Sequence, residues 1–298
     1  MQAVPGKRAL VSRKQPHGQE LPLKNPNNSV SKEALISDLA GLKKFQLEAA
    51  IKFQTLGQFT LWREGQKVGS KEWGRDKTIQ LIQYLISYRN KHALHKEHIM
   101  DHLWEEGDDR DFKVALYGVN KVLEPKRASR TEAVYVERQG VTYQLNLDLV
   151  WIDVEAIENY IVIGNKAMVD FPELAVEAYQ EAVALHHGSY LPNRIYEDWS
   201  SEEREKNQVL ILGALVNLAE LLVTSNPMES IRLTQEAISI DKTWEDAYRI
   251  QMSAYIAKGN RPQALKTYQK CADILDEEYG ISPLPATKAL LKEIEAIA

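Results

Sequence analysis

Histidines are concentrated in one short stretch of the sequence, comprising His92, His95, His98 and His102. On a helix, the last three would share a face, and the i, i+4 spacing of His98 and His102 is one that zinc sites use. No cysteine or later histidine completes a ligand set. We therefore expect solvated or phosphate-proximal histidines, with zinc binding as the alternative, and we predict neither a metal nor another cofactor.

Enzyme motifs are missing from the sequence. It contains no Walker loop, dinucleotide-binding glycine motif, nucleophile elbow or H-E-x-x-H motif. Cys271 is the one cysteine. It cannot form an internal disulfide, which fits a reducing compartment, and its spacing indicates a small core position rather than a nucleophile. The run from Gly107 to Asp111 lacks the ligand alternation of a calcium loop and indicates an acidic turn. We predict that the chain is not an enzyme.

Cationic and polar residues recur through residues 109–138 at spacings suited to DNA. Lys113, Tyr117 and the Asn120–Lys121 pair follow one another at three- or four-residue intervals, so on a helix they share a face. Asparagine can bind adenine bidentately, and lysine can reach guanine or phosphate. A basic loop and a hairpin tip follow, which we expect to hold phosphates. The predicted DNA-binding residues are Arg110, Lys113, Tyr117, Asn120, Lys121, Lys126, Arg127, Arg130 and Arg138. The alternative is an ordinary solvated helix face and loop.

The elements around these residues predict a winged helix. The pattern indicates a strand over 53–62 with a bulge or bend at Gly57, and then a short strand at Lys67-Val68. Apolar periodicity predicts helices over 76–89, 95–104 and 109–123, followed by a β-hairpin over 133–145 that turns at Gln139-Gly140. In a winged helix the third helix enters the major groove and the hairpin lies on the adjacent backbone.

The rest of the chain divides into three further parts. Residues 1–29 are rich in proline and basic residues, which predicts a flexible arm that either tethers DNA phosphates or is simply solvated. A helix is expected within residues 30–52. Beyond Trp151 we expect only helices, with a 34-residue repeat that pairs Asn226 with Asn260 and Ala237 with Cys271. This period is the tetratricopeptide geometry. The predicted domains are an arm (1–29), a helix (30–52), a winged helix (53–150) and a helical repeat domain (151–298).

Charge separates the two halves of the chain. The whole chain carries a formal net charge of −5, but residues 151–298 hold 13 basic and 24 acidic side chains. An acidic half would repel nucleic acid, so any DNA contact falls to the first half. The first residues lack an apolar run, and the Val209–Val223 stretch is too short to span a bilayer, so we expect no signal peptide, no membrane contact and a cytoplasmic location.

Several stretches resemble the bacterial transcriptional activator domain of AfsR/SARP-type regulators. These are Gly188–Pro192, Tyr196–Trp199, Glu202–Arg204 and the Glu277–Thr287 run, which carries Leu284 where the family has serine. The first half is similar to the family's OmpR-like winged helix, in Leu94–Trp104, Ala115–Tyr117 and Lys121–Pro125. The resemblance implies an α+β winged helix-turn-helix followed by an all-α tetratricopeptide-like domain. It also implies side-by-side binding to direct repeats in duplex DNA and recruitment of RNA polymerase.

The third helix departs from the family pattern at Gly118 and Asn120, where basic residues are usual. We expect Gly118 to remove a side chain from the DNA face, and the nearby aspartates Asp108, Asp109 and Asp111 to lie where phosphates would come. Two functions therefore stay open. The first is a transcription activator whose helical half dimerises, contacts polymerase or receives a signal. The second is a signalling adaptor whose winged helix binds protein. The sequence shows no pocket signature for a small-molecule effector.

Overall fold

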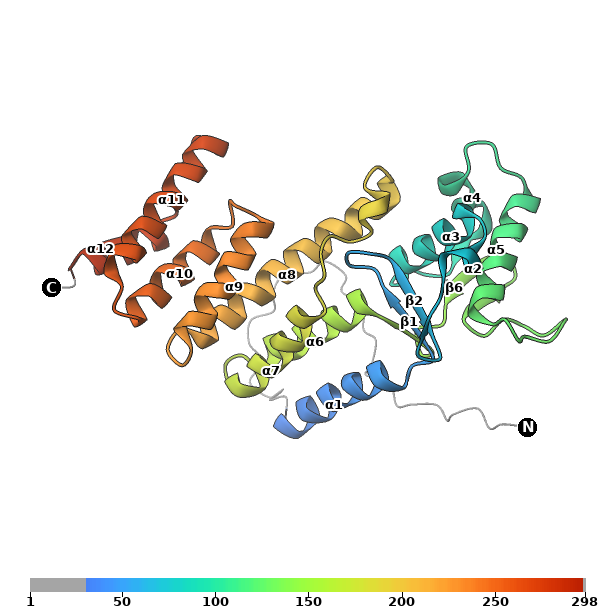
Figure 1. Ribbon diagram of the computed structural model, residues 1–298, viewed down its shortest axis with the longest axis horizontal. Coiled ribbons are helices and arrows are strands. Elements are labelled where there is room, and N and C mark those ends of the chain that lie inside the picture. The colour runs from blue at the N-terminus through green and yellow to red at the C-terminus, as the bar shows by residue number, and fades with distance from the viewer. Residues whose placement is uncertain (1–30, 297–298) are drawn as a thin grey trace.

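The computed structural model describes residues 31–296. Two small β-sheets and their helices form one end of the molecule, and an array of helices extends from there to the C-terminus (Figure 1). The predicted basic arm, residues 1–29, lies outside the described residues. Each helix of the array makes its main contacts with its neighbours in the sequence.

Helix α1 (Lys32–Glu48) precedes the first sheet and packs on the helical array. The Ser31 side chain caps it by accepting a hydrogen bond from the Ala34 amide at 3.2 Å. Leu35 and Leu39 are its buried residues. Lys43 joins it to α7, with its Nζ 2.8 Å from Glu177 and 2.7 Å from Glu181. The helix is therefore part of the folded body.

The first sheet has the strand order β3-β2-β1-β7. Its strands are β1 (Ile51–Gln54), β2 (Thr60–Arg63), β3 (Gln66–Lys67) and β7 (Val150–Ile152). Strands β1 and β2 are antiparallel, whereas β1 and β7 are parallel. The single strand expected over 53–62 is wrong, because the chain reverses direction between β1 and β2. Gly57, in this reversal, has φ +73°, and a Cβ there would lie 2.6 Å from the His187 carbonyl oxygen.

The second sheet and four helices complete this end of the molecule. The helices are α2 (Ser70–Trp73), α3 (Asp76–Ser87), α4 (Lys96–Leu103) and α5 (Asp109–Leu123). The sheet, in the order β4-β6-β5, contains β4 (Leu94–His95), β5 (Val136–Gln139) and β6 (Thr142–Leu145). The three predicted helices and the hairpin are thus present in the predicted order. The turn between β5 and β6 passes through Gly140 at φ +62°.

The second half contains helices that pack on their neighbours in the sequence. They are α6 (Asp153–Ala167), α7 (Pro172–Ala184), α8 (Ser201–Leu222), α9 (Pro227–Ile240), α10 (Glu245–Ala257), α11 (Arg261–Tyr279) and α12 (Pro285–Ala296), with short 3₁₀ turns at Pro192–Arg194 and Asp198–Ser200. The expectation of helices alone beyond Trp151 is wrong at one place, because β7 runs to Ile152.

The 34-residue repeat has a physical basis at two helix starts. Asn226 and Asn260 are both N-caps, and each side chain accepts a hydrogen bond from the amide three residues later at 3.3 Å. Ala237 and Cys271 are both fully buried. The repeat therefore reflects one capping device and one packing position used twice.

Buried polar contacts join the two halves. The Asp153 carboxylate, at the start of α6, accepts hydrogen bonds from the Thr55 amide at 2.7 Å, the Thr55 hydroxyl at 2.6 Å and the Leu56 amide at 2.9 Å. Burial raises the pKa of Asp153, while these donors favour its charged form. Leu56 also forms a β-bridge with Tyr190. The sheet and the helical array are thus held together by a buried carboxylate and by a backbone bridge.

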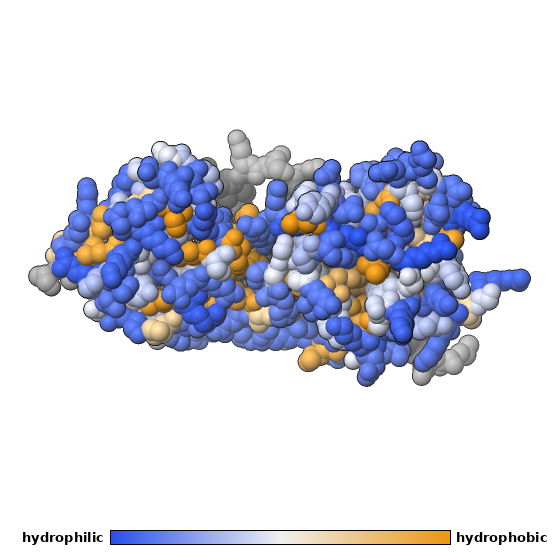
Figure 2. Space-filling model, turned by 45° about the horizontal axis from the view of Figure 1, so that its top comes forward, coloured by the Kyte–Doolittle hydropathy of each residue, from blue (hydrophilic) through white to orange (hydrophobic). Residues whose placement is uncertain are grey.

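Hydrophilic residues dominate the face drawn in Figure 2, and hydrophobic residues gather there in small separate groups. Within residues 31–296, no helix is long and apolar enough to cross a bilayer.

Candidate nucleic-acid interface

Helix α5 starts at a strong N-cap. The Asp108 carboxylate accepts hydrogen bonds from the amides of Arg110 at 2.8 Å and Asp111 at 3.0 Å. The Asp111 side chain accepts in return from the Asp108 amide at 3.4 Å, which completes a capping box. Acidic residues here also interact favourably with the helix dipole. The aspartates therefore have a structural role in starting the helix.

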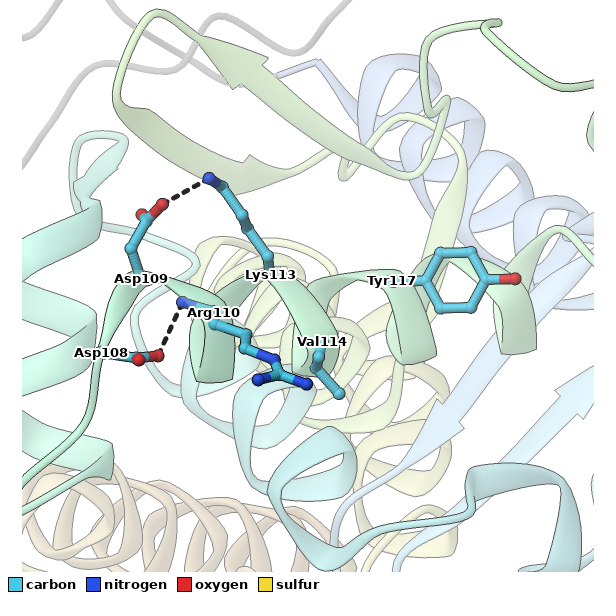
Figure 3. A pocket seen from close by; sticks show the side chains of 6 residues that line it. All are labelled: Asp108, Asp109, Arg110, Lys113, Val114 and Tyr117. Carbon is cyan, nitrogen blue, oxygen red and sulfur yellow. Dashed lines mark hydrogen bonds and ion pairs between the residues drawn. The ribbon is translucent and has the colours of Figure 1, made fainter.

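The two faces of α5 differ in composition. The inner face is buried and consists of Phe112, Ala115, Val119, Val122 and Leu123. The outer face is exposed and presents Arg110, Lys113, Val114, Tyr117 and Lys121. In the close view, Lys113 points toward Asp109, whereas Arg110 and Val114 lie together on the neighbouring side of the helix (Figure 3). Four of the predicted DNA-binding residues thus share an exposed surface.

Asp109 forms ion pairs with two cations beside this surface. It forms an ion pair with Lys113, one turn along α5, and its carboxylate lies 2.6 Å from the Lys96 Nζ at the start of α4. Hydrogen bonds from Lys113 and then Lys96 lower the pKa of Asp109 to about 2. The carboxylate is consequently charged at neutral pH and competes with any phosphate for these two ammonium groups.

Gly118 lies on the inner side of α5, so the expectation that it removes a side chain from the DNA face is wrong. A Cβ at this position would lie 2.6 Å from the Thr78 Oγ1 and 2.9 Å from its Cγ2. Thr78 belongs to α3, and the two helices cross here. Glycine is thus required for the close approach of α3 and α5.

Asn120 is also placed differently from the prediction. The residue is 8% exposed, and its Oδ1 has no hydrogen-bond partner within the described structure. It lies at the floor of a groove of about 390 Å³ between α5 and the hairpin, instead of on the outer face. This groove brings together residues from α4, α5, the following loop and the hairpin: Lys96, Asp109, Phe112, Lys113, Leu116, Tyr117, Asn120, Arg127, Arg138, Val141 and Tyr143.

The loop after α5 divides its cations. Lys126 and Arg130 are exposed, and Arg130 has a left-handed backbone with φ +68°. Arg127 is tied to its own loop, since its Nη1 donates to the Thr131 carbonyl at 3.0 Å and its Nε lies 3.7 Å from Glu124. Only Arg127 of the three lines the groove. The other two lie outside it.

Arg138 is positioned at the end of the hairpin. Its Nε donates to the Gly140 carbonyl at 2.8 Å, and its guanidinium lies over the Tyr143 ring, 5.9 Å from the centroid. These contacts hold the charge above the groove that Lys113 and Tyr117 line on the opposite side. The hairpin and α5 therefore present cations to a common space.

Two residues of this surface, Val114 and Lys96, are not among the DNA-binding residues predicted from the sequence. Val114 lies one turn after Arg110, so the same spacing that selected Tyr117 could have placed it on the outer face. Lys96 is contributed by another helix and had no such signal. Its proximity to Asp109 is a tertiary contact.

The histidines of α4 pack with aromatic rings. His98 and His102 have ring centroids 4.4 Å apart, and Tyr84 lies 5.7 Å from His102. Burial, followed by the neighbouring His102, lowers the pKa of His98. Across residues 31–296, no group of three or more His, Cys, Asp or Glu side chains is arranged to hold a metal ion.

Comparison with protein families decides the identity of the second half. Residues 152–295 match the family model described as "Bacterial transcriptional activator domain". The chain carries a bacterial transcriptional activator domain. This domain begins in β7 and includes every helix from α6 to α12.

Solved structures extend the comparison beyond the activator domain. The fold is similar to that of Mycobacterium tuberculosis EmbR, solved in complex with a low affinity phosphopeptide, with a TM-score of 0.70 and 18% sequence identity. The match covers 83% of this chain and 65% of that chain, so this chain spans less than two thirds of the EmbR chain. The MamA protein matches at a TM-score of 0.31 and 16% identity over 70% of this chain and 99% of that chain, which is too low to bear on the fold. No curated protein sequence matches the chain. The α+β end followed by a helical domain is therefore an arrangement shared with EmbR.

Proposed function

We propose that this protein is a DNA-binding bacterial transcription activator. Residues 53–150 act as a winged helix-turn-helix in which α3, α4 and α5 are the three helices and β5–β6 is the wing. Helix α5 enters the major groove of duplex DNA, and the wing and the loop after α5 hold the adjacent phosphates. The activator domain, as a tetratricopeptide-like array, provides dimerisation, contact with RNA polymerase or signal input.

The observation that carries this proposal is the shared surface of α5 and the hairpin. Arg110, Lys113, Tyr117 and Lys121 are exposed along one face of α5, and Arg138 is held above the adjoining groove by the hairpin. Arginine and lysine can bind guanine edges or phosphates, and tyrosine can donate to phosphate oxygens. The inward position of Gly118 supports the proposal further, because no side chain is missing from the outer face.

Further parts of the proposal follow from the family and the fold. Two copies would bind side by side on direct repeats about one helical turn apart, with homodimer formation on the DNA. The acidic activator domain would lie away from the phosphates, since its net charge opposes them. Such a regulator acts in the cytoplasm.

One observation favours a second candidate, a signalling adaptor that binds protein through the same surface. Asp109 engages both Lys96 and Lys113, and Asp108 and Asp111 place further negative charge at the same end of α5. These carboxylates weaken phosphate binding there. An adaptor of this kind would show no salt-dependent binding to duplex DNA.

Selection of binding sites from a random duplex pool tests the proposal. The protein should enrich a direct repeat with a spacing of about one helical turn, and its affinity should fall steeply with salt because phosphate contacts release counterions. A variant with Arg110→Ala, Tyr117→Ala and Lys121→Ala should lose the enrichment. A matched variant with three exposed residues of the activator domain changed, Val162→Ala, Arg232→Ala and Lys270→Ala, should retain it. Absence of any salt-sensitive duplex binding would favour the adaptor.

A further inference from the structure

One apolar side chain is exposed in the middle of the cationic face of α5. Val114 is 38% exposed, although the other valines of this helix, Val119 and Val122, are buried. Its neighbours along the face are Arg110, one turn before, and Tyr117, one turn after, and Tyr117 is 65% exposed. Val114 lies beside the Arg110 side chain (Figure 3). An apolar group therefore occupies the centre of a surface that is otherwise suited to polar recognition.

Packing within the chain does not account for this exposure. A single exposed valine is ordinary on a protein surface, and a β-branched residue is a modest helix former. Here, however, the valine and the tyrosine ring lie together with Arg110 and Lys113 around one open depression of about 610 Å³, which Asp108 and Asp109 line at the start of α5. Beyond these two carboxylates, the depression combines hydrogen-bond donors with apolar surface. A partner that fits it must offer acceptors and a small apolar group within a few ångströms of each other.

The major-groove edge of DNA offers this combination. Guanine presents the acceptors N7 and O6, and thymine presents a C5-methyl group that apolar side chains contact. Arg110 and Val114 are four residues apart, which is about 6 Å along a helix, and successive bases rise about 3.4 Å. The two side chains can thus reach bases one or two steps apart.

We propose that Val114 is a specificity-determining residue that contacts the C5-methyl group of one thymine, while Arg110 binds a guanine one or two steps away. The inference rests on the proposed function and deepens it, because it names the base that the outer face of α5 selects. It assigns the preference to an apolar contact of Val114 and a guanine contact of Arg110, whereas phosphate contacts by the lysines of the same face would supply affinity without sequence preference.

Replacement of thymine by deoxyuridine tests the contact, since it removes the methyl group alone. The highest-affinity duplex from the selection is prepared with each thymine replaced singly, and binding is measured by fluorescence anisotropy at fixed salt. One replacement should weaken binding of the wild-type protein about fourfold, the value for one buried methyl-sized group. In the Val114→Ala variant, the same deoxyuridine replacement should change the logarithm of Kd by less than half of the change seen with the wild-type protein. Val162→Ala, a change at an exposed helical valine of the activator domain, should retain the full fourfold effect.

The possible outcomes distinguish a failure of the Val114 contact from a failure of the proposed function. If the selected site lacks thymine, or if Val114→Ala keeps the full sensitivity to deoxyuridine, the contact is overturned while DNA binding stands. If the wild-type protein binds no duplex, both the contact and the proposed function fall. Circular dichroism of Val114→Ala should match wild type, because the replaced side chain is on the surface.

Discussion

The guanidinium of Arg89, just after α3, lies against the carboxylate of Glu203 in α8, with 2.7 Å between Nη1 and Oε1. Arg89 also bonds Glu158 of α6, and Lys206 lies 2.8 Å from the same Glu158 carboxylate. The Arg89 side chain is completely buried. The end of α3 is therefore fixed to two helices of the activator domain by an ionic network around a buried guanidinium.

Replacement of Arg89 by methionine should destabilise the protein strongly. Removal of one partner from a buried ion pair leaves uncompensated charge, which costs about 3–5 kcal/mol. Urea denaturation followed by circular dichroism should show this loss in the free energy of unfolding. Lys91→Met serves as the control, since Lys91 pairs with Glu202 across the same interface but both side chains are exposed, and its effect should stay below about 1 kcal/mol. Equal effects of the two changes would contradict a special role for the buried network.

Gly118→Ala should destabilise the crossing of α3 and α5. The new methyl group would overlap the Thr78 side chain, and overpacking of this kind costs typically about 1–3 kcal/mol, against about 1 kcal/mol gained in helix propensity. We expect a net loss of about 1 kcal/mol by thermal or urea denaturation. Thr78→Ala in the same chain should recover part of it. Gly213→Ala, where the space around a Cβ is empty, should instead stabilise α8. If Gly118→Ala is stabilising too, the two helices are not in close contact.

Under the proposed function, Asp109→Asn should strengthen duplex binding. The change frees Lys96 and Lys113 from their shared carboxylate, so both can reach phosphate. The slope of the logarithm of the association constant against the logarithm of the salt concentration should steepen by about 1–2, since each added phosphate contact contributes about 0.9. The pKa of Asp109 is lowered to about 2. The difference in duplex affinity between the wild-type protein and this variant should therefore be constant between pH 5 and 8. It should shrink only as the pH falls through the acidic range toward that value. Unchanged affinity at every salt concentration would show that neither lysine contacts DNA.

Cys271 should be unreactive in the folded protein. It is fully buried beside Tyr248 and Leu275, and burial raises the pKa of its thiol to about 12. A thiol reagent at pH 8 should therefore modify it at the rate of unfolding, with Cys271→Ala as the blank. The neutral thiol stabilises the folded state fully below the usual pKa of about 9, and this contribution is lost as the pH rises toward about 12. Fast modification without denaturant would disprove the core position.

Local signals were sufficient to predict several elements from the sequence, while tertiary contacts were not visible in it. The bounds of the predicted third helix, 109–123, are those of α5, because an aspartate cap begins it and Pro125 follows its end. The hairpin over 133–145 was likewise predicted from alternation and a glycine turn. The burial of Asn120 and the inward face of Gly118 depend on how α3 and the hairpin pack on α5, and helical spacing alone does not reveal that packing. The parallel pairing of β1 with β7 joins residues about one hundred positions apart and had no local signal.

The buried links between the two halves, at Asp153 and at Arg89, have a consequence for promoter architecture. Under the proposed function, the activator domain projects from the DNA in one fixed direction, because these buried contacts join it to the first sheet and to the end of α3, and α3 packs on α5. Moving the binding site by about half a helical turn would swing this domain to the opposite side of the duplex, and a full turn of about 10 base pairs would restore its direction. Transcription should then vary periodically with the distance between the binding site and the polymerase.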